Sequence, residues 1–88
     1  MDEYIAQTTR LWAHDPTYGW MFRNGMNDQA RHNAELEGHQ LCTFIIGGFP
    51  PEKAFDAAYP QVEETATESQ LNAATGRIAS DVLCPPTG

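Results

Sequence analysis

Basic residues are scarce in this chain of 88 residues: five Lys and Arg stand against 12 Asp and Glu, which gives a formal charge of −7. Affinity for nucleic acid depends largely on basic side chains that displace counterions from phosphates. The same shortage of cations disfavours binding to anionic lipid surfaces. We therefore expect no direct binding to nucleic acid or to membranes. The partner that suits this charge is a larger protein with a basic surface.

Long hydrophobic runs are also missing. No stretch approaches the roughly 18 apolar residues of a membrane span, and the first residues lack the basic and apolar regions of a signal peptide. The only two cysteines, Cys42 and Cys84, are too few for a disulfide framework. We expect a cytoplasmic protein in which both thiols stay reduced.

No alternation of apolar and polar residues is long enough for a strand, so the sequence predicts an all-α fold. A chain this short buries only about two thirds of its unfolded surface, which leaves little room for both a core and a deep substrate cleft. We expect a single-domain bundle of four or five short helices over residues 1–84, followed by a loose tail over residues 85–88. No catalytic residues and no cofactor motif are recognisable, and we predict neither enzyme activity nor a cofactor.

The bundle is expected to form around a central helix over residues 28–46. Asn27 and Asp28 provide capping chemistry at its start, and Gly47-Gly48 ends it. The C-terminal end of this helix is expected to lie in the core. Its apolar stripe consists of Ala30, Ala34, Leu41 and Ile45.

Three further helices are predicted from their ends. Residues 2–13 begin with two acidic side chains, which suit a helix N-terminus. Pro51 opens a short helix, which Pro60 ends.

The last helix begins at one of two capping boxes and runs to residue 83. The two candidate boxes are Thr65 with Glu68 and Thr67 with Gln70. A glycine in the interior of this helix, Gly76, costs about 1 kcal/mol relative to alanine.

Four possible metal ligands lie on one face of the central helix, because they follow one another at steps of three and four residues: His32, Glu35, His39 and Cys42. One straight helix usually supplies two ligands of a zinc ion, so a second element would have to provide the others. Alternatively, this face is the polar margin of the helix, with Cys42 buried as a small apolar side chain. We predict no bound metal and keep these four residues as the candidates.

An aromatic segment between the first two helices supplies one part of the predicted partner-binding surface. Tyr18 and Phe22 share a helical face, and we expect them to pack against Leu41 and Ile45. Trp20 points some 200° away from Tyr18 by the period of a helix. Burial trends favour Trp20, Met21 and Phe22 as core that closes over the central helix. From the helical period we nevertheless expect Trp20 to be partly exposed and, together with Tyr18, to contact the partner.

Acidic residues before and within the last helix supply the other part: Glu63, Glu64 and Glu68. Carboxylates at such intervals could mimic nucleic-acid phosphates and occupy a basic groove of a partner. Alternatively, they serve only to keep a small domain from associating.

Residues 39–83 contain, in order, a helix, the Gly47-Gly48 turn, the segment 51–60, a short connector and a capped helix. This order resembles the helix-turn-helix segment of phage terminase small subunits, where an Ala-rich helix leads through a turn to a recognition helix. The resemblance covers about half the chain and implies a DNA-binding role. The candidate recognition helix has Arg77 as its only basic residue, whereas helices that read DNA rely on several.

We predict a small acidic protein-interaction module that binds a larger protein. In general character it is similar to the accessory and inhibitory proteins of phages, which would place it in the cytoplasm of the host cell. The first alternative is a helix-turn-helix protein of DNA packaging or transcription. The second is a small structural or decoration protein of a virion.

Overall fold

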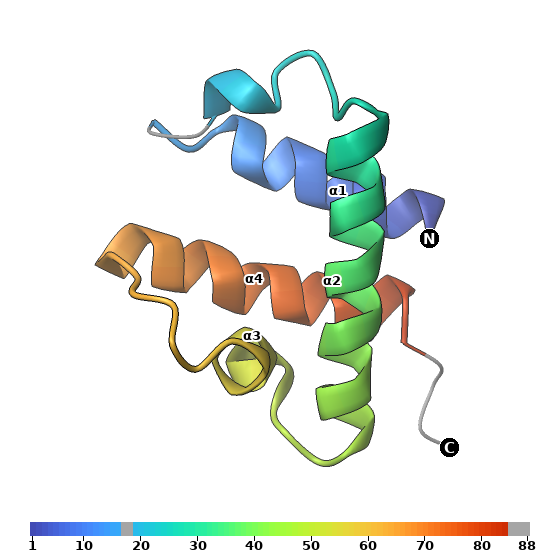
Figure 1. Cartoon of the computed structure of the whole chain (residues 1–88), viewed down its shortest axis with the longest axis vertical. Coiled ribbons are helices and arrows are strands. Elements are labelled where there is room, and N and C mark those ends of the chain that lie inside the picture. Colours follow the sequence, from blue (N-terminus) through green and yellow to red (C-terminus); the bar gives the residue numbers. More distant parts are fainter. Residues whose placement is uncertain (17–18, 85–88) are drawn as a thin grey trace.

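The regular elements of the chain are helices throughout the part described by the computed structural model, residues 1–16 and 19–84 (Figure 1). The predicted all-α fold is confirmed. The predicted tail, residues 85–88, and Tyr18 lie outside the described residues. The elements are α1 (Asp2–Ala13), η1 (Gly19–Met21), α2 (Asp28–Ile46), η2 (Pro51–Lys53), α3 (Ala54–Ala58) and α4 (Ala66–Val82).

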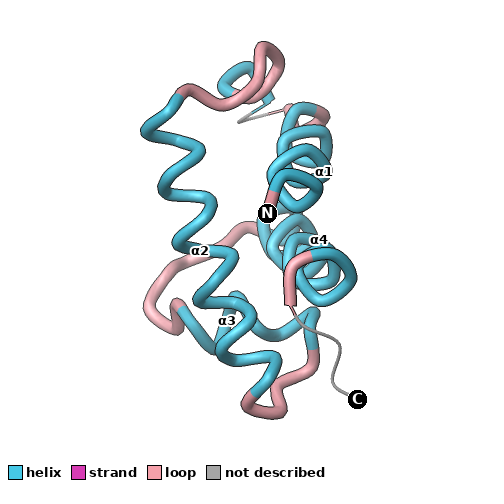
Figure 2. The backbone as a smooth tube through the Cα atoms, turned by 90° about the vertical axis from the view of Figure 1, so that its right-hand side faces the viewer, coloured by secondary structure: helices cyan, strands magenta, loops and turns pink. Residues whose placement is uncertain are grey.

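The three long helices form two layers. α1 and α4 lie side by side, and α2 crosses both of them (Figure 1). Figure 2 shows the same arrangement from the side, with α2 in one layer and with α1 and α4 in the other. The short α3 packs against α2 and α4. None of the described helices is both long enough and apolar enough to cross a lipid bilayer.

Capping chemistry fixes the ends of α2 and α4. The Asn27 side chain accepts a hydrogen bond of 2.8 Å from the Ala30 amide, and Thr65 Oγ1 accepts one of 3.1 Å from the Glu68 amide. Thr65 is therefore the N-cap of α4, which selects the first of the two candidate capping boxes. After α2, the chain turns at Gly48, whose φ of 112° is readily adopted only by glycine.

The hydrophobic core is small and includes the C-terminal half of α2. Six residues form it: Tyr4, Ile5, Leu41, Cys42, Ala54 and Ala79. The expectation that the C-terminal end of α2 lies in the core was wrong for the last residue, because Ile46 is 54% exposed. Phe44 and Ile45, just before it, still pack against the core.

Gly76 has a packing role that the sequence did not reveal. A Cβ atom at this position of α4 would overlap the main-chain carbonyl of Pro51 in η2. The absence of a side chain thus lets the backbone of η2 approach α4 directly. The close approach explains a glycine in the middle of a helix, where it otherwise lowers stability.

A disulfide joins Cys42 of α2 to Cys84, just after α4, with the two Cα atoms 5.3 Å apart. The expectation that both thiols stay reduced was therefore wrong. The two cysteines are 42 positions apart in the sequence. They meet because the end of α4 returns to the C-terminal half of α2, and this depends on how the helices pack.

Replacing Gly76 with alanine should destabilise the protein, although alanine favours a helix by about 1 kcal/mol over glycine. The added methyl group forces α4 and η2 apart, and a main-chain atom cannot swing away as a flexible side chain can. We expect a net loss of about 1–2 kcal/mol in urea unfolding. The control Ala73→Gly measures how much free energy of unfolding is lost when glycine replaces alanine elsewhere in the same helix. A Gly76→Ala variant more stable than the wild type would contradict this packing.

Removing the disulfide with Cys84→Ala should lower the free energy of unfolding by ~4 kcal/mol, because the unfolded chain regains the freedom of a loop of 42 residues. A reductant should lower the melting temperature of the wild type but leave that of the variant unchanged. Rapid alkylation of both cysteines in the folded wild type without reductant would show that the bond is absent.

Candidate binding surface

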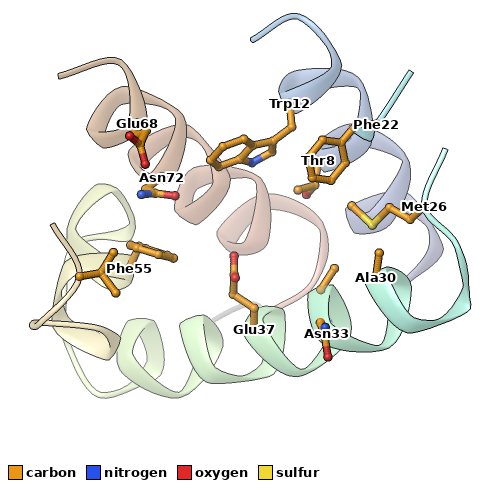
Figure 3. A pocket seen from close by; sticks show the side chains of 12 residues that line it. Thr8, Trp12, Phe22, Met26, Ala30, Asn33, Glu37, Phe55, Glu68 and Asn72 are labelled. Atoms are coloured by element: carbon orange, nitrogen blue, oxygen red, sulfur yellow. The ribbon is translucent and has the colours of Figure 1, made fainter. Parts of the chain in front are cut away.

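An open cleft of about 420 Å³ lies between α1, α2 and the N-terminal half of α4 (Figure 3). α3 and the connector before α4 complete its walls. Most of the lining is apolar: Trp12, Phe22, Met26, Ala30, Ala34, Phe55 and Val62. The polar lining residues are Thr8, Asn33, Glu37, Glu68 and Asn72. Among the described residues, the lining contains two carboxyl groups and no Lys, Arg or His.

The aromatic wall is held in place by a hydrogen bond from α1 to α4. Trp12 Nε1 donates to Thr75 Oγ1 over 3.2 Å, and this fully buried hydroxyl donates to the Leu71 carbonyl over 2.8 Å. Phe22 packs beside the indole, with ring centroids 6.1 Å apart and planes tilted by 39°. Two aromatic rings thus form a fixed surface on the α1 side of the cleft.

Glu37 projects from α2 into the middle of the cleft (Figure 3). Its carboxyl group makes no hydrogen bond or ion pair with any described residue. Burial raises the pKa of Glu37 because the charged form loses hydration. A desolvated carboxylate without a cation is costly in a folded protein.

Two buried hydroxyl groups lie in the same region of α1. Neither Tyr4 Oη nor Thr8 Oγ1 makes a hydrogen bond of good geometry within the described chain. Burial, and then the charge of Glu37, raises the pKa of Tyr4 above its ordinary range, and the nearby Thr8 hydroxyl opposes part of this rise. Thr8 lines the cleft and is only 5% exposed.

The predicted acidic residues lie at and near the rim of the cleft, around the start of α4. Glu68 lines the cleft, and Glu63 is exposed on the connector. Glu64 accepts a hydrogen bond of 2.5 Å from Asn72 Nδ2. A hydrogen bond with Asp56 raises the pKa of Glu64, because two neighbouring carboxyl groups share a proton more easily than they carry two charges.

The aromatic segment is arranged differently from the expectation. Trp20 lies on η1 and is 68% exposed, as predicted. Phe22 packs against Trp12 and faces the N-terminal half of α2, so its expected contact with Leu41 and Ile45 was wrong. The reason is that η1 packs against α1, whereas Leu41 belongs to the core together with Tyr4 and Ile5.

The four candidate metal ligands on α2 are not brought together. Glu35 forms an ion pair of 3.3 Å with Arg31 Nε, and Cys42 is bonded to Cys84. His32 and His39 are exposed. Within residues 1–16 and 19–84, no three His, Cys, Asp or Glu side chains converge on a point that could hold a metal ion.

The segment that resembles a helix-turn-helix consists of the five-residue α3, a connector over residues 59–65, and α4. α4 packs against α1, α2, α3 and η2, and its buried residues are Asn72, Thr75, Gly76 and Ala79. Arg77 is exposed on this helix, where Asp81 is also exposed.

Sequence reasoning missed Glu37, although a signal was present. Ala30, Ala34 and Leu41 were recognised as the apolar stripe of the helix. Glu37 follows Ala34 by three residues and precedes Leu41 by four, so it lies on that stripe. A carboxyl group at an inward-facing position is unusual without a partner.

Comparisons with protein-family models, with curated proteins and with solved structures find no match to this chain.

The buried carboxyl group of Glu37 predicts a pH-dependent stability. A carboxyl group whose pKa is raised on folding stabilises the fold below its unfolded pKa of about 4.3, and this contribution is lost as pH rises through the folded pKa. Glu37→Gln should therefore raise the melting temperature at neutral pH, and the difference should disappear below about pH 4.

The control for this measurement is Glu52→Gln. Glu52 lies exposed on η2, and its replacement removes the same single charge. Its melting temperature should follow that of the wild type at both pH values. A Glu37→Gln variant that is no more stable at neutral pH would mean that the carboxylate is compensated in solution.

Proposed function

We propose that the protein is a non-enzymatic interaction module that binds a larger protein with a basic surface. The observation that carries this proposal is the exposure of Trp20, which leaves 68% of the residue accessible to solvent. Tryptophan is enriched among the few residues that dominate the energy of protein interfaces. Phe22, two residues further on, is packed on Trp12, so the exposed indole projects from a supported segment.

The charge of the surface supports a basic partner. Glu63, Glu64 and Glu68 lie around the start of α4, and Asp56 is close enough to Glu64 to raise the pKa of its carboxyl group. Such a group attracts Lys and Arg side chains and raises the rate of association at low salt. Because exposed charge pairs contribute little affinity, the acidic group is proposed to select and orient the partner while Trp20 provides most of the binding energy.

The location of the protein in the cytoplasm stays a prediction. The Cys42–Cys84 disulfide argues against it, because such bonds persist mainly in oxidising compartments. Binding of a basic protein does not depend on either location.

Trp20→Ala should abolish partner capture without unfolding the protein. We expect the free energy of unfolding to change by no more than about 0.5 kcal/mol, as for other exposed positions. The affinity should fall by roughly thirtyfold or more. The measurement is capture of proteins from an extract of the source cell by the immobilised wild type and variant, with the affinity then determined for the purified partner.

The matched control is Leu36→Ala, which removes another large exposed apolar side chain, 55% accessible, from α2. It should retain the partner. Capture should weaken as salt is raised, since the acidic group contributes through screened charges. Equal capture by Trp20→Ala and wild type would contradict the proposed contact. Salt-sensitive retardation of duplex DNA at submicromolar protein would favour the helix-turn-helix alternative instead.

A further inference from the structure

The cleft has the size and lining of a small-molecule site. Its volume of about 420 Å³ falls in the range of pockets that hold compact organic ligands, roughly 300–1,000 Å³. Rings from three separate segments, Trp12, Phe22 and Phe55, face the space (Figure 3). A ligand with an apolar body would cover these rings and remove them from water.

The polar groups of the cleft specify the charge of such a ligand. Glu37 reaches the middle of the cleft with no cation beside it, and Glu68 lies at the rim. An anionic ligand would meet two carboxylates and a net charge of −7. A neutral apolar ligand would desolvate Glu37 further without compensating it.

A primary ammonium group suits the Glu37 carboxylate, because it has three donors and can serve both carboxylate oxygens. Thr8 also lines the cleft, but its hydroxyl oxygen is shielded from solvent beside the Tyr4 hydroxyl and does not face a ligand.

We propose that the cleft is a binding site for a small organic cation, an apolar body of about the size of an aromatic ring that carries a primary ammonium group paired with Glu37. The aromatic walls favour the same ligand, because ring faces attract cations. This site is separate from the proposed contact at Trp20, so either can fail while the other holds.

Three matched probes test the proposal with the wild-type protein: phenylbutylamine, phenylbutanol and phenylbutyrate, which share an apolar body and differ in charge. We expect the amine to bind at least about tenfold more tightly than the alcohol, and the carboxylate to bind weakest. Binding is measured by NMR titration. The largest shift changes should fall on the Trp12 indole N–H and on the amides of residues 34–37.

Two variants of equal charge then separate pairing with Glu37 from general attraction to an acidic protein. In Glu37→Gln, the amine should lose its preference over the alcohol, because the carboxylate that pairs with the ammonium group is gone. In Glu52→Gln, which removes a charge from the exposed surface, the preference for the amine should persist. Ala30→Phe, which fills part of the cleft, should weaken the binding of both ligands.

Four outcomes would overturn the proposal. They are the absence of amine binding at millimolar concentration, equal affinity of the wild type for amine and alcohol, a preference for the amine that survives in Glu37→Gln, and shift changes that map outside the cleft. The comparison of the three probes needs only the wild type, so the test stands even where a variant does not fold.

Discussion

The contact between Gly76 and the carbonyl of Pro51 sets the spacing on which the rest of the fold depends. It brings η2 against α4 without an intervening side chain. On the same helix, Thr75 and Ala79 are completely buried and both are small. Helices that meet through small residues approach closely, so α4 can contact α1, α2, α3 and η2 at once. The core that results is tight but has little volume.

The core accommodates one large aromatic side chain, Tyr4. Trp12, Phe22 and Phe55 lie outside the six-residue core and line the cleft at the N-terminal half of α4. The C-terminal end of the same helix is held differently, by the disulfide from Cys84 to α2. A small domain gains more from such a covalent link than a large one, since its buried surface contributes less. α4 thus has one end fixed covalently and one end at an open binding surface.

Local chemistry made much of the fold predictable. The span of α2, its cap at Asn27 and the start of α4 at Thr65 follow from signals within a few residues of each helix end. The exposure of Trp20 also followed from local helical period. Contacts between distant segments were not predictable in this way. Phe22 was assigned to the wrong part of α2, and the pairing of Cys42 with Cys84 was missed, because both depend on how α1 and α4 pack beneath α2.

Glu37 shows why the apolar stripe and the candidate site must be considered together. The stripe of α2 would pack more stably with an apolar residue between Ala34 and Leu41, because a carboxyl group there loses hydration and gains no partner. Deviations of this kind from a consistent core pattern are expected at functional sites, where local stability is lost in favour of binding. The disulfide supplies stability elsewhere in the chain that can offset such a loss. The desolvated carboxylate lowers the stability of the free protein because it has lost hydration. A bound cation would compensate this loss, so the lower stability and the proposed preference for a cationic ligand have the same physical origin.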